Sequence, residues 1–348
     1  MTFPSRNIIS RPTVCIIIAA ALTVLLLALN VLTGSVDIAP SEVWTALSGG
    51  PCSADIAYIV RGSRLPSAVT ALLAGASLAA AGLLLQTLFA NPLADPAILG
   101  INSGAGLGVA VAVLLMGGGM SAAGVTLTGF TLTVAAALVG AVTILLLLSV
   151  FAAILRSNIM LLITGIMTGY LVSAVIELLS ATASAEGVHS FIFWGMGSFA
   201  GVGRAALLPF ALCSVVFLLL AFLMVKPLNA LLLGPAYAAN LGVNLRRTRL
   251  LLLLITGGLS AIPTALCGPV AFIGLAVPHM ARFASATADH RTLLPLTMLI
   301  GAITALASNA VCAAPRWGVM LPLNVVTSLW GVPVILYVIF SSRHRGRL

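Results

Sequence analysis

Glu177 is the side chain with the clearest potential for chemistry inside a membrane, because it is the one carboxylate well inside an apolar run. An ionisable residue at membrane depth is by default a candidate for a proton or ion pathway. Glu177 lies near the outer end of its predicted helix, however, where a long side chain reaches the interface easily. Both interpretations stay open, and a proton-coupled transporter would depend on this residue almost alone.

A metal site is not expected from the histidines and cysteines. His279 and Arg282 are three positions apart and share a helix face, but no acid or cysteine stands near His279 at ligand spacing. We expect Arg282 to anchor the membrane interface. The cysteines show neither metal spacing nor a disulfide framework, so we expect them to pack as small apolar residues. They are Cys15, Cys52, Cys213, Cys267 and Cys312.

The patterns of a nucleotide site and of a catalytic site are missing. A phosphate-binding loop ends in Gly-Lys-Ser/Thr, whereas the only lysine, Lys226, is followed by Pro227. The chain therefore cannot bind ATP by that device. An intramembrane enzyme would need clustered carboxylates, histidines or a nucleophile dyad, and the sequence offers none of them. We expect a protein that is not an enzyme and that binds no cofactor itself.

The composition places the chain in lipid. Its 348 residues are 61% hydrophobic and 7% charged, against roughly 25% charged in an ordinary soluble domain, and the mean hydropathy is +1.21. These values exclude a soluble enzyme and a disordered linker. The net charge of +9 does not indicate nucleic acid, because the cations stand singly between apolar blocks. The predicted fold class is an all-α polytopic membrane protein.

Charge-free apolar runs, divided where glycine and proline end helices, predict about ten spans in a single transmembrane domain, residues 1–348. The first run is too long for a cleaved signal, so we expect it to be retained. The expected spans are 14–33, 65–88, 98–116, 126–154, 159–182, 204–225, 250–267, 270–285, 293–312 and 324–341.

The lysines and arginines predict the orientation of these spans. An even number of spans puts both termini on one side of the membrane. With the termini inside, twelve cations face the cytoplasm and four face outward. We therefore expect cytoplasmic termini. The four outer cations are Arg61, Arg64, Arg204 and Arg316.

Three segments are not expected to span the membrane. Residues 41–47 predict an interfacial helix in an outer loop, and residues 188–200 predict a short helix at the outer surface. Residues 227–247 form the longest cytoplasmic loop and alternate apolar with small residues before a basic cluster. Two short amphipathic helices fit there, and they would need a protein surface to cover them.

The segment 91–96, Asn-Pro-Leu-Ala-Asp-Pro, precedes the third span. Asp95 followed by Pro96 predicts a helix start, with a capping carboxylate and a proline at the first helical position. Glycines follow at four-residue spacing, which favours close helix packing. The alternative is a discontinuous element that lines a translocation path. The polar residues of that path would be Gln86, Asn91 and Asn102, together with Glu177.

Several motifs occur in one order along the chain. They include Arg64-Leu65-Pro66, Gly75-Ala76-Ser77-Leu78-Ala79, Asn91 to Pro96, Trp194-Gly195-Met196-Gly197-Ser198, Leu241-Gly242-Val243, Gly268 to Leu275 and Pro278-His279. In this combination the chain resembles the permeases of ABC importers for iron-siderophores, haem and cobalamin. The likeness covers nearly the whole chain from about residue 60.

This resemblance implies a bacterial inner-membrane subunit with the type II ABC importer permease fold. Such a subunit pairs with a second copy of itself, and the cargo passes along the dimer axis. Two ABC ATPase subunits bind on the cytoplasmic side and hold ATP and Mg. A soluble substrate-binding protein docks outside through acidic residues that meet arginines of the permease.

The resemblance also implies site residues. Arg64 matches a docking arginine, and Arg61 or Arg316 would compensate for Ser67, which stands where some relatives have a second one. The loop 227–247 matches the helices that couple the permease to its ATPase. Its expected coupling residues are Leu233, Gly234, Ala238, Leu241, Gly242 and Arg246.

The cargo and the energy source have alternatives. A ferric siderophore or related iron chelate is favoured because such carriers are numerous in the family, and cobalamin or haem is the alternative cargo. The other class of function is an ion-coupled secondary transporter, which would need an ionisable core that only Glu177 offers. Transport that survives Glu177→Gln and requires ATP would dismiss that class.

Overall fold

The computed structural model describes residues 11–115, 127–155, 157–313 and 321–344, and all regular elements within these ranges are helices. The chain runs through α1 (Arg11–Leu32), α2 (Pro40–Ser48), α3 (Ala54–Ala57), η1 (Tyr58–Arg64), α4 (Leu65–Leu88), α5 (Ile101–Ala110), η2 (Val111–Leu115), α6 (Leu127–Ile154) and α7 (Asn158–Thr182). It continues through α8 (Ala185–Gly195), η3 (Phe199–Gly201), α9 (Arg204–Leu223), α10 (Val225–Leu231), α11 (Pro235–Asn240), α12 (Leu245–Cys267), α13 (Ile273–Ser285), α14 (His290–Cys312) and α15 (Leu323–His344).

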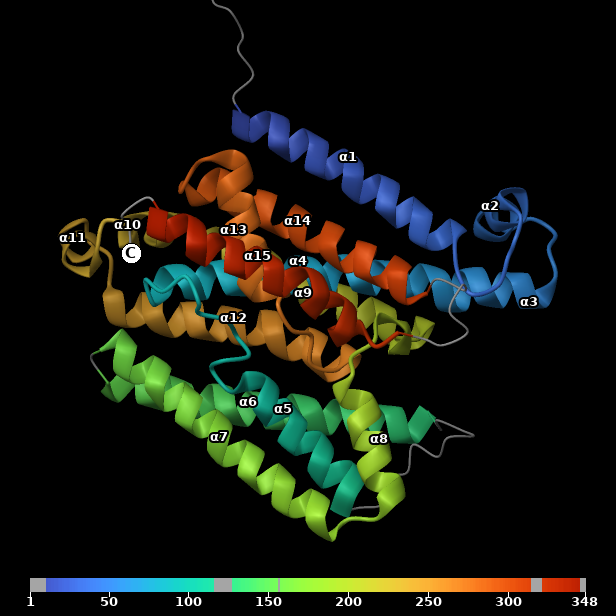
Figure 1. Ribbon diagram of the computed structural model, residues 1–348, viewed down its shortest axis with the longest axis horizontal. Coiled ribbons are helices and arrows are strands. Elements are labelled where there is room, and N and C mark those ends of the chain that lie inside the picture. The colour runs from blue at the N-terminus through green and yellow to red at the C-terminus, as the bar shows by residue number, and fades with distance from the viewer. Residues whose placement is uncertain (1–10, 116–126, 156, 314–320, 345–348) are drawn as a thin grey trace, which may run out of the picture.

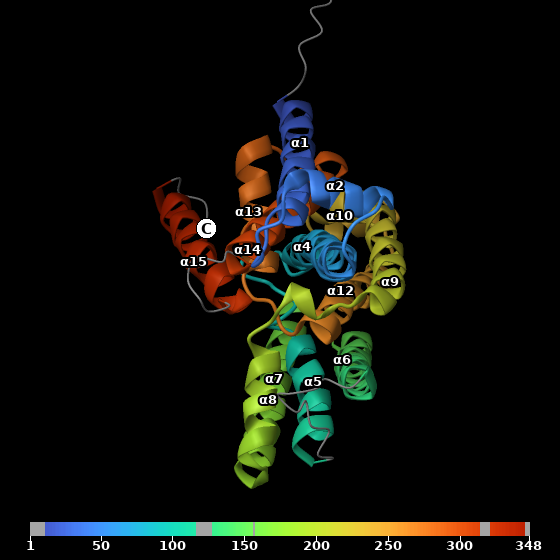
Figure 2. The same ribbon diagram turned by 90° about the vertical axis from the view of Figure 1, so that its right-hand side faces the viewer.

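Helix α4 is the central element of the fold. It packs against α14, α12, α13 and α9, and Figure 2 shows it end-on with these helices around it. Helices α5, α6, α7 and α8 form a second group beside this bundle (Figure 1). The helix from Ala54 through Leu88 is 83% buried over its most apolar window, whereas α7 is 17% buried over its own. Helix α4 is therefore enclosed by its neighbours, whereas outer helices such as α7 and α9, both 17% buried, leave apolar surface for lipid or for other chains.

Small residues let the helices approach α4 closely. A Cβ atom on Gly82 would overlap the backbone carbonyl of Gly274 in α13, and a Cβ on Gly75 would overlap the carbonyl of Gly301 in α14. The same holds for Gly108 against α6, at the spacing read from the sequence. Backbone-to-backbone packing of this kind replaces the hydrophobic driving force that helices lack in lipid.

Seven helices in the described residues are long and apolar enough to cross a membrane. Two shorter apolar helices, Ile101–Leu115 and Leu323–Val338, add to them, and α13 occupies the expected span 270–285 with only 13 residues. An all-helical polytopic membrane fold is thereby confirmed, while the number of crossings stays a prediction. The glycine run at 117–119, expected to divide two spans, lies outside the described residues.

The helix start expected at Asp95 and Pro96 is wrong, because α5 begins only at Ile101. Asp95 Oδ1 does accept the backbone amide of Ala97 at 2.8 Å, and so caps a single turn. That turn is broken by Gly100, which has a φ of 80° at the N-cap of α5. Local side-chain bonds to the backbone compete with helix formation in this way. Residues 89–100, named here the connecting segment, therefore remain non-helical.

The other short elements lie where the sequence predicts them. Helix α2 covers the expected outer helix 41–47, and α8 with η3 covers the region 188–200. Helices α10 and α11 lie in the loop 227–247. Proline at the first position of α11 follows Gly234, whose φ of 98° makes the sharp turn between them.

Candidate functional site

The first candidate surface lies on α10 and α11. Leu233, Tyr237 and Leu241 are exposed over 62%, 53% and 58% of their surfaces. Tyr237 lies on α11, whereas Leu233 lies in the turn between the two helices and Leu241 directly follows α11. Three large exposed apolar side chains this close together favour a protein partner over bare solvent. Gly242 and Arg246 follow on the same exposed stretch, and Gly234 is partly exposed.

Ala238 differs from the other expected coupling residues, because its side chain is fully buried. It is the buried residue of α11, and its carbonyl accepts the amide of Val243 at 3.0 Å. In this conformation Ala238 cannot contact another chain. It holds the exposed face of α11 in position instead.

Asn229 anchors α10 to the start of α14. Its Nδ2 donates to Asp289 Oδ1 at 2.6 Å, and its Oδ1 accepts from the backbone amide of His290 at 2.9 Å. The ring nitrogen Nδ1 of His290 also lies 2.8 Å from this oxygen. A carboxylate only accepts hydrogen bonds, which fixes how the Asn229 amide is turned and leaves Nδ1 as the donor.

The contact continues into α4. His290 is 1% exposed, and its Nε2 lies 2.9 Å from Thr87 Oγ1 in the last turn of α4. With Nδ1 carrying the proton, a neutral His290 presents Nε2 as an acceptor to that hydroxyl. One chain of hydrogen bonds therefore leads from α10 through α14 to the central helix.

Asp289 is the exposed end of this chain. The backbone amide of Arg291 donates to its carboxylate at 2.9 Å. That bond, followed by the bond from Asn229, holds the pKa of Asp289 below its usual value. Hydrogen bonds to the charged form favour it.

His279, Arg282 and Gln86 connect α13, α4 and the connecting segment. Arg282 Nη1 donates to Gln86 Oε1 at 2.7 Å, and Gln86 Nε2 donates to the carbonyl of Leu275 at 3.1 Å. His279 Nε2 lies 2.8 Å from the carbonyl of Pro92. The helix face that His279 and Arg282 were predicted to share thus contacts other parts of this chain. Gln86 is only 3% exposed and forms hydrogen bonds within the helix packing.

The other expected path residues are separated. Asn102 Oδ1 accepts from Thr264 Oγ1 at 3.0 Å and from Ser260 Oγ at 3.3 Å, both in α12. Asn91 Oδ1 accepts the amide of Leu93 at 2.9 Å in the connecting segment. Glu177 is exposed on α7. The four residues do not converge within this chain, and a path that includes them stays a prediction.

Arg64, expected to meet a binding protein, is 7% exposed. Its Nη1 donates to the carbonyl of Leu32 at 2.8 Å and to that of Val31 at 3.3 Å, and its Nη2 donates to the carbonyl of Val36. Arg64 therefore caps the end of α1, which favours a cation. A docking role for Arg64 stays a prediction. The buried conformation of its side chain does not favour that role.

Arg61 behaves similarly, since its Nε donates to the carbonyl of Ala46 in α2. Arg61 is partly exposed, in contrast to the buried Arg64. Arg316 lies outside the described residues. Of the three expected docking arginines, Arg61 is the one that the described structure leaves accessible.

A cavity of about 560 Å³ lies beside Arg64, between α1, α4, α14 and the chain around α8. Ser67 Oγ donates to Asn309 Oδ1 at 3.2 Å, and Asn309 Nδ2 donates to Asn30 Oδ1 at 2.8 Å along its wall. Ser67 is thus part of a buried polar chain. The end of α1 and the start of α4, which line this cavity, lie at the end of the molecule opposite to α10 and α11 (Figure 1).

Asn324 forms tertiary hydrogen bonds that were not predicted from the sequence. Its Nδ2 donates to the carbonyls of Pro269 at 2.8 Å and Gly195 at 3.0 Å, and its Oδ1 accepts the amide of Ala271 at 3.0 Å. It joins the end of α8, the break between α12 and α13, and the start of α15.

The chain is similar to known transport proteins. The model of the FecCD transport family matches residues 22–341. The vitamin B12 import system permease protein of Klebsiella pneumoniae is 37% identical over 289 residues, which cover 81% of this chain and 82% of the relative. The corresponding protein of Salmonella typhi is 37% identical over 280 residues, covering 80% and 82%.

A solved structure shows the same fold. It is an inward-facing conformation assigned to a metal-chelate type ABC transporter, with a TM-score of 0.81 and 28% sequence identity. The match covers 94% of this chain and 98% of that chain. The family predicted from the sequence motifs is thereby confirmed.

Proposed function

This chain belongs to the FecCD transport family. We propose that it moves a bulky metal chelate across a bacterial cytoplasmic membrane, and that cobalamin is the favoured cargo. It is the permease subunit of an ABC importer and is not itself catalytic. The ATP and Mg belong to a separate ATPase, and the chain itself holds no cofactor. The exposed apolar surface of α10 and α11 is the observation that carries the proposal.

The ATPase is the partner that fits this surface. The exposed side chains of Leu233, Tyr237 and Leu241 are apolar, and the basic start of α12 with Arg246 and Arg247 follows directly. By the positive-inside rule, a loop with this charge faces the cytoplasm, as the termini then do. Two ATPase subunits, one for each copy of the permease, would bind there.

The Asn229–His290–Thr87 chain supplies a route for coupling. It joins the ATPase-facing helix α10 to the end of α4. Gln86 is the neighbour of Thr87, and its bonds to Arg282 and Leu275 extend the route to α13. A displacement of α10 by the ATPase would thus reach the helices that hold the connecting segment, and alternating access would follow as a population shift between two packings.

A second copy of the chain is expected to complete the path. Helix α7 leaves most of its apolar window open, and Ile192 and Phe193 of α8 are more than half exposed. A cargo that passes between two copies would meet such faces. A substrate-binding protein would dock at the opposite end, where Arg61 is accessible.

Cobalamin is favoured over the ferric siderophore because the two named relatives at 37% identity import vitamin B12. The ferric siderophore and haem are alternative cargoes of the same importer class. The test is ATP-dependent uptake into liposomes that contain the chain, its ATPase and its binding protein. Cobalamin, ferric siderophores and haem would be supplied in turn, with a non-hydrolysable ATP analogue as control.

Each outcome has a distinct meaning. Uptake of cobalamin alone supports the full proposal, and uptake of a ferric siderophore alone replaces the cargo while retaining the importer. A folded chain that binds no ATPase would contradict the permease mechanism. Uptake without ATP that is lost in Glu177→Gln would favour the ion-coupled transporter instead.

A further inference from the structure

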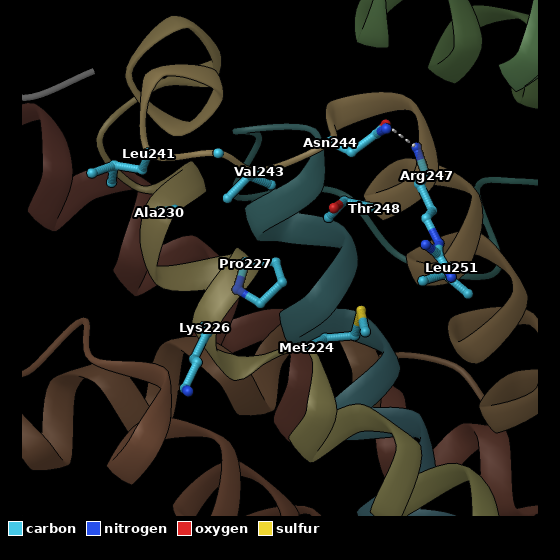
Figure 3. Close-up of a pocket in the computed structure, with 11 residues that line it drawn as sticks. Met224, Lys226, Pro227, Ala230, Leu241, Val243, Asn244, Arg247, Thr248 and Leu251 are labelled. Carbon is cyan, nitrogen blue, oxygen red and sulfur yellow. Dashed lines mark hydrogen bonds between the residues drawn. The ribbon is translucent and has the colours of Figure 1, made fainter.

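A groove lies beside the ATPase-facing helices and shares Leu241 and Gly242 with the surface proposed for the ATPase. It has a volume of about 470 Å³ and lies between the end of α9, helix α10, the turn after α11 and the start of α12. Met224, Pro227 and Leu251 give it an apolar wall (Figure 3). Its two cations, Lys226 and Arg247, lie at opposite edges with Thr248 between them (Figure 3).

The hydroxyl group of Thr248 points to a ligand. Thr248 is 7% exposed and lines the groove, yet its Oγ1 forms no hydrogen bond with any of the described residues. Other buried threonines in these helices donate to the carbonyl four residues earlier, as Thr256 does to Leu252 at 2.7 Å and Thr297 to Leu293 at 2.7 Å. Because Thr248 lines the groove, a polar ligand there can accept the proton of this hydroxyl.

The charge of the groove selects an anion. Neither Lys226 nor Arg247 forms an ion pair with a carboxylate among the described residues. Thr248 also lies in the first turn of α12, a helix of 23 residues whose N-terminus favours negative charge. The Lys226 side chain points away from Thr248 (Figure 3), so the two cations make the groove positive at its edges, which favours an anionic group near the hydroxyl and the helix N-terminus.

The apolar surface next to the groove favours a lipid as the anionic ligand. The groove begins at the end of α9, and Leu219 and Leu223 of that helix are exposed over 61% and 68% of their surfaces. In a membrane this apolar face lies against acyl chains. A phospholipid could therefore place its phosphate near Thr248 and its chains along the groove wall and α9, whereas free phosphate would leave the apolar wall uncovered.

We propose that the groove bounded by Lys226, Arg247 and Thr248 binds the phosphate headgroup of an anionic phospholipid. The bound lipid would lie between the membrane and the helices that face the ATPase. The lipid would therefore fix the position of α10 and α11 in the membrane plane. This inference does not depend on the cargo of the importer.

The test measures phospholipid bound to the purified full-length chain in detergent by native mass spectrometry. Phosphatidylglycerol is added to the unaltered chain and to Lys226→Gln, Arg247→Gln and Thr248→Val. Loss of one cation should weaken binding about fivefold, as expected for a basic residue at an anionic membrane surface. Thr248→Val keeps the side-chain volume and should weaken binding severalfold. Phosphatidylcholine should bind more weakly than phosphatidylglycerol to the unaltered chain.

Arg246→Gln is the matched control, because Arg246 is exposed next to Arg247 but does not line the groove. It should bind phosphatidylglycerol as the unaltered chain does. Equal binding by Arg246→Gln and Arg247→Gln would overturn the proposal. Displacement of the lipid by an equal concentration of inorganic phosphate would assign the groove to free phosphate and also overturn it.

A partner protein is distinguished by a parallel measurement. Affinity for the ATPase is determined for Arg247→Gln in detergent without added lipid. Unchanged lipid binding with weakened ATPase binding would show that an acidic segment of the ATPase occupies the groove, which contradicts the lipid assignment. Failure of cargo transport with intact lipid binding would affect only the proposed function.

Discussion

Asn229 in α10 and His290 in α14 are joined by two contacts to one oxygen atom, since Asn229 Oδ1 lies 2.9 Å from the backbone nitrogen and 2.8 Å from Nδ1 of His290. The two residues are 61 positions apart in the sequence. Helix α10 borders the loop proposed to face the ATPase, whereas His290 also contacts the central helix through Thr87. The pair therefore connects the proposed coupling loop to the helix bundle by direct hydrogen bonds.

We expect Asn229→Ala to uncouple ATP hydrolysis from transport. The substitution removes the bonds to Asp289 and His290 and leaves the buried imidazole Nδ1 without a partner, which costs about 1–3 kcal/mol. Cargo transported per ATP hydrolysed should fall while ATPase binding persists. Asn240→Ala at the exposed end of α11 is the control and should leave the unfolding midpoint unchanged. An unaltered transport-to-hydrolysis ratio in Asn229→Ala would contradict the coupling route.

The α10–α11 surface gives a second prediction. Glutamate at both Leu233 and Leu241 should abolish ATPase binding without unfolding the permease, because both side chains are exposed. Ala238→Asp should instead reduce the yield of folded protein, since it places an unpaired charge at a fully buried position. Co-purification with the ATPase and size-exclusion profiles separate the two effects. Retained ATPase binding by the double variant would disprove the coupling surface.

Gly82 tests the close packing of the core. Gly82→Ala should destabilise the protein by about 1–3 kcal/mol or more, because the added methyl overlaps the Gly274 carbonyl. The measurement is the thermal unfolding midpoint in detergent. Gly195→Ala is the matched control, since a Cβ there meets no atom within 4 Å, and it should cause little change. Equal midpoints for the two variants would contradict the close approach of α4 and α13.

Asn324 should hold the outer ends of several helices together. Asn324→Ala breaks its bonds to Gly195, Pro269 and Ala271, and we expect a loss of about 1–3 kcal/mol. Val325→Ala at the neighbouring, 48% exposed position should cost less than about 0.5 kcal/mol. Thermal unfolding distinguishes these outcomes. A larger loss for Val325→Ala would indicate that the packing of α15, and not the amide, stabilises this end.

The lowered pKa of Asp289 predicts that the stability of the folded protein decreases at acidic pH. Its pKa is lowered in the folded protein, so the stability it contributes is present above its unfolded pKa of about 3.9. That contribution is lost as the pH falls through the lower folded value. Thermal unfolding at a series of pH values from neutral into this acidic range should show this loss. Asp289→Asn should show less of it, whereas the same slope in both proteins would contradict the assigned bonds.

Hydrophobic runs and charge distribution were sufficient to predict the membrane class, an all-helical fold and the positions of the principal helices. Lipid burial and the positive-inside rule act on local composition, so a single sequence carries that information. The short outer helices and the pair of helices in 227–247 were predicted for the same reason. The glycine spacing after Asp95 likewise predicted close approaches, although not that α6 would meet Gly108.

The tertiary structure decided the roles of individual polar residues. Arg64 was expected at the surface and caps α1 instead, while the exposure of α11 depends on the burial of Ala238. Asn229 and Asn324 gave no decisive local signal, because their partners lie far away in the sequence. Hydropathy is a property of neighbours along the chain, whereas a buried hydrogen bond depends on which distant donor and acceptor meet after the helices have packed.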